Sequence, residues 1–453
     1  MGNKKKSAAI DMTKGAIAGP LVLFILPLIG SSIFQQLYNT VDFLFVGNLL
    51  NRTSAAAVGA SSTLITCTIG LFSGISVGES VVMSQNVGKG DRAEAERAMH
   101  SSVAFGILGG LCIMLLGILF APAVLRTLNT PESAMHEAVV YMRIYLLSLP
   151  MLVFYNMISG AMRSYGDSDT PFRILVICGF VNVAADWVFV SAFPLGVAGV
   201  AIATAISQGL SAILAAFFAS RPDREIRLSM KKLKLDMSIF GQVLSIGLPA
   251  GVQTIIVTFS NVAVQYYIND FGETAVAAFA TYYKVENFIY LPIMAFGQAA
   301  TTFAGQNFGA GQYGRIKKGT FVINAMGALT VGIIAGVILL FPRTVFTWFM
   351  KDSEVVDNAL MIALVSFPFY WIYPILEVTG GILRGMGYAL SSMVIIISNM
   401  CVVRIALLAI FSSTIHTIRS LGAVYPITWA TTAICFVALA AWVFKKRLKQ
   451  DIH

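Results

Sequence analysis

Charged, histidine and cysteine residues are all scarce in this sequence. Only 12% of the residues are charged, about half the fraction typical of soluble domains. The four histidines and five cysteines form no CxxC motif and no Cys/His cluster, which argues against a metal-binding or disulfide-based fold. HExxH, GxSxG and Walker-type motifs are also absent. We therefore expect a protein that is not an enzyme and that needs no organic cofactor.

Long apolar runs, by contrast, fill almost the whole 453-residue chain, of which 57% is hydrophobic. About 20 consecutive apolar residues suffice to cross a bilayer as a helix. Twelve such segments are predicted: 16–48, 55–83, 99–125, 136–162, 172–193, 196–218, 239–267, 274–304, 319–348, 356–382, 389–412 and 421–444. The sequence therefore predicts an all-α integral membrane protein with twelve transmembrane helices.

The basic residues are distributed unevenly over the predicted connections. If the N-terminus, the even-numbered loops and the C-terminus lie on one side, that side holds 23 of the 31 lysines and arginines, and the other holds five. The positive-inside rule then predicts a multi-pass protein of the inner or plasma membrane with both termini cytoplasmic. The first apolar stretch is too long for a signal-peptide h-region. The net charge of +9 indicates orientation and contact with membrane lipids, and gives no nucleic-acid signal.

The chain also matches itself at an offset of 221 residues. "QNVGKG" (85–90) falls on "QNFGAG" (306–311), and "GAMRSYG" (160–166) falls on "GILRGMG" (381–387). One constant offset over more than a hundred residues indicates an internal duplication. We predict an N-lobe at 1–218 with helices one to six, a basic cytoplasmic linker at 219–238, and a C-lobe at 239–453 with helices seven to twelve.

Each half contributes an even number of helices, so both halves enter the membrane in the same direction. They are therefore parallel repeats related by an axis along the membrane normal. Two equivalent bundles around such an axis are typical of secondary transporters that work by alternating access, with the substrate site near the repeat interface. The architecture thus favours a transporter.

Four polar residues at similar predicted depth interrupt the apolar runs of the first half. Asp42 lies near the outer end of helix one, and Thr204 lies on helix six. Asn182 and Asp186, in "GFVNVAADWVFV" (179–190), are four residues apart and share one face of helix five. At about 1.5 Å of rise per residue, all four lie roughly 8–18 Å below the outer surface. Charged groups at such depths usually face a cavity or a partner.

Two functions fit this set of side chains, which we predict to form a cation-coupling site. Two carboxylates, an amide oxygen and a hydroxyl suit a hard cation such as Na⁺. Alternatively, the two carboxylates share a proton. A purely structural interpretation is that Asp42 caps a helix end and Asn182 bonds a neighbouring helix.

Three acids and one arginine elsewhere have other predicted roles. Glu286 of helix eight either pairs with Arg404 of helix eleven or faces the cavity and binds a cationic substrate. Glu79 and Glu377 lie near inner helix ends, where we expect a capping or interface role.

The sequence resembles the multidrug and toxic compound extrusion (MATE) transporters over essentially its whole length. The resemblance depends on "VDFLFVG" in helix one, the paired "QNVGKG" and "QNFGAG", the paired "GAMRSYG" and "GILRGMG", "KVENFIYLP" in helix eight and "VNVAADWVFV" in helix five. It implies two six-helix bundles in a V-shaped arrangement. The family's N-lobe cation ligands match Asp42, Asn182, Asp186 and Thr204. The seventh helix lacks the acid found in some members, so the resemblance places the site in the first lobe.

The resemblance implies a Na⁺- or H⁺-coupled antiporter that exports organic cations or amphiphilic drugs. An alternative from the same superfamily is a flippase for a lipid-linked substrate. That activity would require cationic residues lining the cavity, and only Arg143, Lys284 and Arg404 lie within predicted helices. We expect the protein to act on small drug-like molecules and to be a monomer.

Overall fold

The computed structural model describes residues 9–50, 52–193 and 195–450, and in this part of the chain all regular secondary structure is helical, with no strand. Eleven of the described helices are long and apolar enough to cross a membrane. A helix pair bent by 55°, Ser353–Phe369 with Ile372–Gly385, makes up to twelve spans when it is counted as one. The helices suit a bilayer because each satisfies its own backbone hydrogen bonds where no water is present.

The chain divides into two compact units. Unit 1 holds Leu26–Gly251 and the chain up to Asp11, and unit 2 holds Met12–Ile25 and the chain from Val252 onward. Helices α1 (Ala18–Leu49) and α7 (Met237–Asn269) are each divided between the units. The lobe boundaries predicted from the sequence repeat, 1–218, 219–238 and 239–453, stay a prediction.

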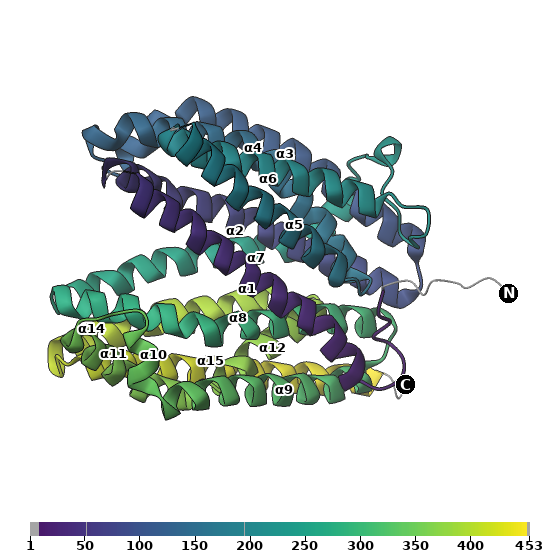
Figure 1. Ribbon diagram of the computed structural model, residues 1–453. Coiled ribbons are helices and arrows are strands. Elements are labelled where there is room, and N and C mark those ends of the chain that lie inside the picture. The colour runs from purple at the N-terminus through teal and green to yellow at the C-terminus, as the bar shows by residue number, and fades with distance from the viewer. Residues whose placement is uncertain (1–8, 51, 194, 451–453) are drawn as a thin grey trace. The chain divides into compact units, whose positions relative to one another are not determined.

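Besides its parts of α1 and α7, unit 1 contains α2 (Arg52–Lys89), α3 (Arg92–Thr127), α4 (Glu132–Ser164), α5 (Asp169–Asp186), the π-helix η1 (Trp187–Ala192), α6 (Gly196–Ala219) and the short 3-10 helix η2 (Met230–Lys232). Helix α4 packs against α2, α3 and α6 (Figure 1). The helix α5 packs against α6, as the very short connection between them requires. Helices α2 and α7 approach closely through Gly74, Gly78, Gly247 and Gly251, because a side chain at these positions would meet the facing backbone.

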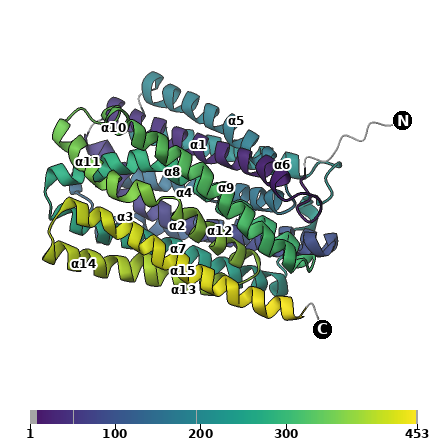
Figure 2. The same ribbon diagram turned by 90° about the horizontal axis from the view of Figure 1, so that it is seen from below.

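The elements of unit 2 are α8 (Glu273–Gly309), α9 (Tyr313–Leu340), α10 (Pro342–Thr347), α11 (Ser353–Ser366), the 3-10 helix η3 (Phe367–Phe369), α12 (Ile372–Gly385), α13 (Ala389–Ile396), the π-helix η4 (Ile397–Val403), α14 (Arg404–Thr414) and α15 (Ile418–Gln450). Helix α8 packs against α9, α11 and α12, and α12 also contacts α15 (Figure 2). The predicted segment 319–348 is two helices, because Pro342 cannot donate a backbone hydrogen bond and therefore starts a new helix.

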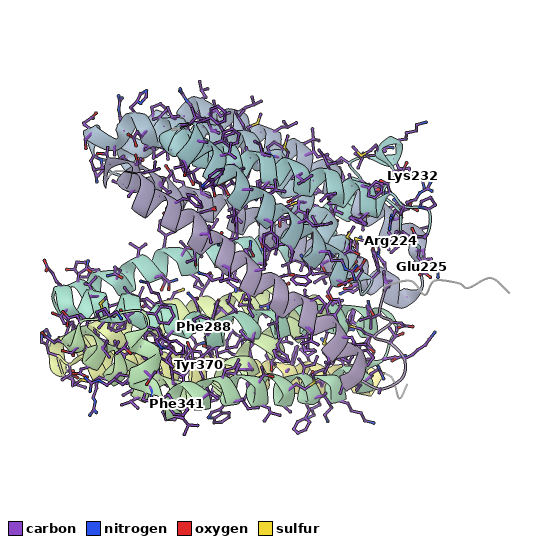
Figure 3. All side chains as sticks on the ribbon, viewed as in Figure 1. Arg224, Glu225, Lys232, Phe288, Phe341 and Tyr370 are labelled. Carbon is purple, nitrogen blue, oxygen red and sulfur yellow. The ribbon has the colours of Figure 1, made fainter. Side chains whose placement is uncertain are left out.

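The basic segment between α6 and α7 is fastened to unit 1 by ion pairs. Arg224 pairs with the fully buried Asp167, and its second terminal nitrogen donates to the Thr170 hydroxyl at 3.0 Å. Lys232 pairs with Glu96 of α3 at 3.0 Å, and Figure 3 shows Arg224, Glu225 and Lys232 at the same end of the unit. The Tyr165 hydroxyl lies 3.4 Å from Arg224, and burial raises the pKa of this tyrosine. The segment is thus a docked strap on the surface of unit 1.

Candidate cation site in unit 1

Three of the four predicted site residues meet inside unit 1. The side-chain nitrogen of Asn182 donates to Asp42 Oδ1 at 2.9 Å and to Asp186 Oδ2 at 3.3 Å when the amide is oriented to satisfy both contacts. The carboxyl groups of Asp42 and Asp186 also lie within hydrogen-bonding reach of each other. Asn182 and Asp186 are fully buried, and Asp42 is partly buried. The arrangement brings two carboxylates and one amide into a single cluster.

The other carboxylate oxygen of Asp186, Oδ1, is buried and has no hydrogen-bond partner among the described residues. Such groups are rare in native proteins, because each leaves a desolvated acceptor without compensation. The helix also changes at this point, since the π-helix η1 begins immediately after Asp186. Short π-helical segments occur frequently at functional sites. Binding of a proton or a cation at this oxygen stays a prediction.

The fourth predicted residue, Thr204, is buried on α6, and its hydroxyl donates to the Val200 carbonyl of its own helix at 3.0 Å. That hydrogen bond leaves the oxygen lone pairs of Thr204 available. Its direct participation in the cation site stays a prediction.

An apolar cluster and a group of tyrosines surround the site. The apolar cluster consists of Val46, Tyr141, Val190, Val197, Val200 and Ala201. Val46, Val190 and Val200 each lie four residues from Asp42, Asp186 and Thr204, toward the predicted outer surface. Tyr38 and Tyr141 lie within electrostatic range of both carboxylates. The acids are thus separated from the predicted outer surface by about one turn of packed apolar side chains.

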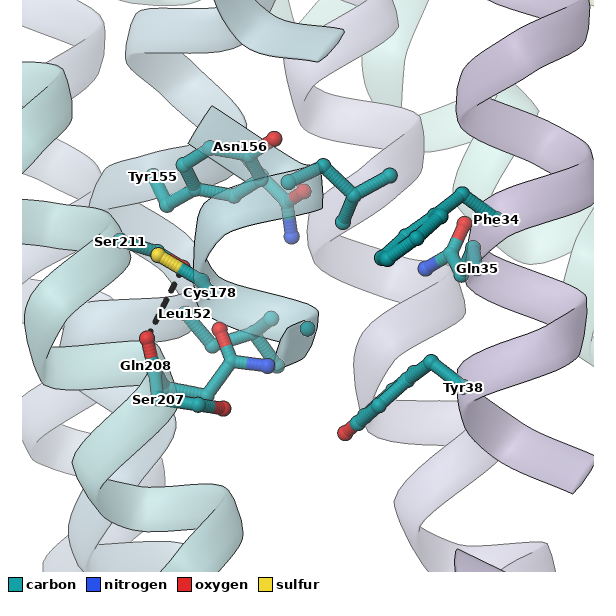
Figure 4. Close-up of a pocket in the computed structure, with 12 residues that line it drawn as sticks. Phe34, Gln35, Tyr38, Leu152, Tyr155, Asn156, Cys178, Ser207, Gln208 and Ser211 are labelled. Carbon is teal, nitrogen blue, oxygen red and sulfur yellow. Dashed lines mark hydrogen bonds between the residues drawn. The ribbon is translucent and has the colours of Figure 1, made fainter. Parts of the chain in front are cut away.

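On the side of Asp42, Asn182 and Asp186 that faces away from the apolar cluster, unit 1 contains a cavity of about 60 Å³. Figure 4 shows Phe34, Gln35 and Tyr38 of α1 facing polar residues of α4, α5 and α6 across it. The facing side chains include Tyr155, Asn156, Cys178, Ser207, Gln208 and Ser211. A buried water needs roughly 10–15 Å³ of such space, so the cavity accommodates a few waters.

The cavity residues were not among the predicted site residues, although helical spacing points to several of them. Gln35 and Tyr38 precede Asp42 by seven and four residues, and Cys178 precedes Asn182 by four, so each pair shares one helix face. These offsets could have identified Gln35, Tyr38 and Cys178 from the sequence alone. Asn156 of α4 gave no such signal, because its position opposite α1 depends on the tertiary packing.

The second predicted group lies in unit 2, where Glu286 is held by tyrosines. Tyr370 donates a hydrogen bond to Glu286 Oε1, and the Tyr282 hydroxyl lies 3.4 Å from the same atom. Arg404 lies over the Tyr425 ring at 5.2 Å, and among the described residues it forms no direct ion pair with Glu286, although the two charges are within electrostatic range. Figure 3 places Tyr370 within the side chains of unit 2. The roles proposed for Glu286 and Arg404 stay predictions.

A duplicated helical membrane protein with buried carboxylates in its first repeat belongs to the class of polytopic membrane transporters. The profile of the MatE family matches residues 27–188 and 249–410. These two ranges repeat the internal duplication at an offset of about 222 residues. The chain belongs to the multidrug and toxic compound extrusion (MATE) family.

Relatives of similar sequence and solved structures agree with this assignment. The chain is 30% identical over 411 residues to the probable multidrug resistance protein YpnP of Bacillus subtilis (strain 168), covering 89% of this chain and 91% of that protein. It is 21% identical to the multidrug export protein MepA of Staphylococcus aureus (strain MSSA476), covering 84% and 82%. An outward-facing structure of a multidrug resistance MATE family transporter matches with a TM-score of 0.93 at 20% identity, covering 98% of this chain and all of that one. The structural match confirms the all-helical membrane fold.

Proposed function

We propose that this chain is a proton-coupled antiporter that exports drug-like organic compounds. The observation that carries the proposal is the buried, unpartnered Asp186 Oδ1 in a cluster that Asn182 joins to Asp42. A carboxylate in this environment is costly unless a proton or a cation is bound. The names of the relatives, which are multidrug resistance and export proteins, support the substrate class.

The two adjacent carboxyl groups favour a proton over Na⁺ as the coupling ion. With the amide nitrogen turned toward them, Asn182 donates to both carboxylates, and with the amide oxygen turned toward them it would instead add an oxygen ligand for Na⁺. Two adjacent carboxyl groups share one proton readily, because like charges at short distance cannot both remain ionised at low cost. Sodium is the alternative that the experiment below tests.

The coupling follows from the charge of the cluster. When a proton binds Asp186, the carboxylate loses its charge and its hydrogen bond from Asn182 weakens, since hydrogen bonds to ionised acceptors are the stronger ones. This changes the contact between α1 and α5 that Asp42, Asn182 and Asp186 provide. A ligand shifts a conformational equilibrium only by binding the two states with different affinity, and the proton does so here through this contact. Release of the proton toward the cytoplasmic side then resets the cluster.

The test uses purified protein in proteoliposomes loaded with ethidium. An acid jump outside the vesicles, at constant Na⁺ and zero membrane potential, is expected to drive ethidium efflux by the wild type. In Asp186→Asn the efflux rate is expected to fall by at least about tenfold, which corresponds to a barrier increase of about 1.4 kcal/mol. Fluorescence of the released dye measures the rate.

A matched control lies on the same helix. Asp169 of α5 forms an exposed ion pair with Arg173, so Asp169→Asn should leave the efflux rate unchanged. Efflux that responds to a Na⁺ jump and not to acid would show that the coupling ion is Na⁺. Wild-type rates in Asp186→Asn would refute the site assignment, and no dye movement under either gradient would favour a flippase or another specific exporter.

A further inference from the structure

Glu79 of α2 is a buried acid that the proposed antiport mechanism does not use. Its side chain is fully buried, and neither carboxylate oxygen has a hydrogen-bond partner among the described residues. The backbone of α4 passes directly over it at Gly160, where an added methyl group would lie 2.6 Å from Ser76 Oγ and 3.7 Å from Glu79 Oε2. A helix-capping role is therefore excluded, because Glu79 lies ten residues before the end of α2 at Lys89 and faces α4.

The charged group that faces Glu79 is Arg163 of α4. The two side chains interact electrostatically but form no direct ion pair within 4.0 Å among the described contacts. Tyr155 of α4 lies within electrostatic range of Arg163, and its hydroxyl donates to the Pro171 carbonyl at 3.2 Å. Among the described residues of α3, α4 and α7, which pack around α2, no other titratable side chain lies within electrostatic range of Glu79.

The second half of the chain arranges its corresponding arginine and its acid differently. At the offset of 221 residues, Arg163 corresponds to Arg384 and Glu79 corresponds to Ala300. The acid of the second half, Glu377, instead lies on the same helix as its arginine and forms a direct ion pair with Arg384 at 2.8 Å. Both halves thus keep one arginine and one acid at the inner end, but only the acid of the second half forms a direct ion pair with its arginine.

Ser76, which precedes Glu79 on α2, contacts a helix that lines the cavity of unit 1. The Ser76 hydroxyl donates to the Asn156 carbonyl at 2.8 Å, and Asn156 lines the cavity. Glu79 follows Ser76 by three residues, which is about 4.5 Å along the helix axis toward the cytoplasmic end. Glu79 itself does not line the cavity, whose lining residues come from α1, α4, α5 and α6.

We propose that Glu79 is a second proton-binding site of unit 1. A proton from a hydronium ion binds one carboxylate oxygen of Glu79 and forms a neutral carboxyl group, leaving water. When the proton leaves toward the cytoplasmic side, the resulting carboxylate is attracted to Arg163. The direction of proton movement rests on the proposed antiport function.

Infrared difference spectroscopy of the purified protein in lipid tests proton binding directly, without transport. During a pH titration the wild type is expected to show the carbonyl stretch of a protonated carboxyl group that disappears in Glu79→Gln. The same band should persist in Glu377→Gln, the matched acid of the second half, and in Asp186→Asn. A spectrum of Glu79→Gln identical to that of the wild type at every pH would overturn the proposal.

Ethidium exchange at equal pH on both sides supplies the second readout. The wild-type exchange rate is expected to depend on pH, and Glu79→Gln should lose one titrating step that Glu377→Gln keeps. If Glu79→Gln does not fold, Glu79→Asp replaces it in the infrared experiment. This variant is expected to shift the infrared band instead of removing it. If the wild type exchanges no dye, the antiport function fails while the infrared result still decides the role of Glu79.

Discussion

Asp186 and Asp236 show how differently one residue type behaves inside a span and at its end. Asp186 is fully buried and keeps one oxygen unpartnered. Asp236 precedes α7, pairs with Arg97 of α3, and accepts hydrogen bonds from the backbone nitrogens of Ser238 and Ile239 at 3.1 and 3.4 Å. The first arrangement leaves room for a ligand, whereas the second satisfies the acid and fastens the strap to α3.

The Arg97–Asp236 contact predicts an acid-dependent loss of stability. The hydrogen bond from Arg97, with those from the two backbone nitrogens, holds the pKa of Asp236 below its usual value of 3.8. A lowered folded-state pKa contributes stability above the unfolded-state pKa and loses it as the pH falls through the folded-state value. The unfolding temperature of Asp236→Asn should therefore lie slightly below that of the wild type between about pH 5 and 8, and the difference should shrink below the unfolded-state pKa. Thermal unfolding in detergent measures it, and a constant difference at all pH values would contradict the assignment.

At the scale of whole elements, α2 and α7 approach through small residues. A methyl group at Gly78 would lie 2.3 Å from the Val243 carbonyl oxygen, and one at Gly74 would lie 2.2 Å from the Gly251 nitrogen. Backbones this close leave no space for any side chain, so the contact depends on glycine at both positions.

Gly78→Ala is expected to destabilise unit 1. Inserting a methyl group into a closely packed contact costs about 1–3 kcal/mol, so the thermal unfolding temperature should fall measurably. Gly59→Ala on the same helix is the control, because nothing lies within 4 Å of the added carbon. Its midpoint should be unchanged or slightly higher, since alanine favours the helix by up to about 1 kcal/mol. Equal midpoints for the two variants would contradict the close α2–α7 contact.

For the whole molecule, the distribution of basic residues predicts orientation in the membrane. The strap between α6 and α7 carries six lysines and arginines and belongs to the side with the basic excess, whereas the connection between α3 and α4 belongs to the other. The described residues stop short of both termini, so the connections are the segments to probe. The expected monomeric state also stays a prediction.

Labelling of introduced cysteines tests this orientation. In intact cells a membrane-impermeant maleimide should label Glu132→Cys at the start of α4 and should label Lys234→Cys only after permeabilisation. Both positions are exposed, and the protein without either substitution measures background from the native cysteines. Labelling of Lys234→Cys from outside would reverse the predicted topology.

The fold was largely predictable because hydropathy depends on local composition. Every predicted span has a helical counterpart in the structure, but the segment 356–382 is a pair of helices bent by 55°. The 3-10 helix η3, which contains Pro368, lies at this bend. A hydropathy window does not detect such a break, because the apolar composition continues across it.

The candidate site was predictable only where single residues stood out against apolar surroundings. Asp42, Asn182 and Asp186 were identified in this way, and the structure brings them together. Glu79 was expected to have a capping or interface role, and its unpartnered burial against Gly160 became visible only in the structure. The partner of Glu286, Tyr370, is 84 residues away and lay outside the reach of spacing arguments.

The sequence by itself determined that this is a duplicated, helical membrane protein with acids buried in its first half, because apolar length, charge and repeat offset are properties of the linear chain. Only the tertiary structure decided which polar atoms find partners. Hydrogen bonding depends on distances of about 3 Å between helices that are far apart in sequence. For this reason the unpartnered oxygens of Asp186 and Glu79, and the cavity in unit 1, emerged only from the packed helices.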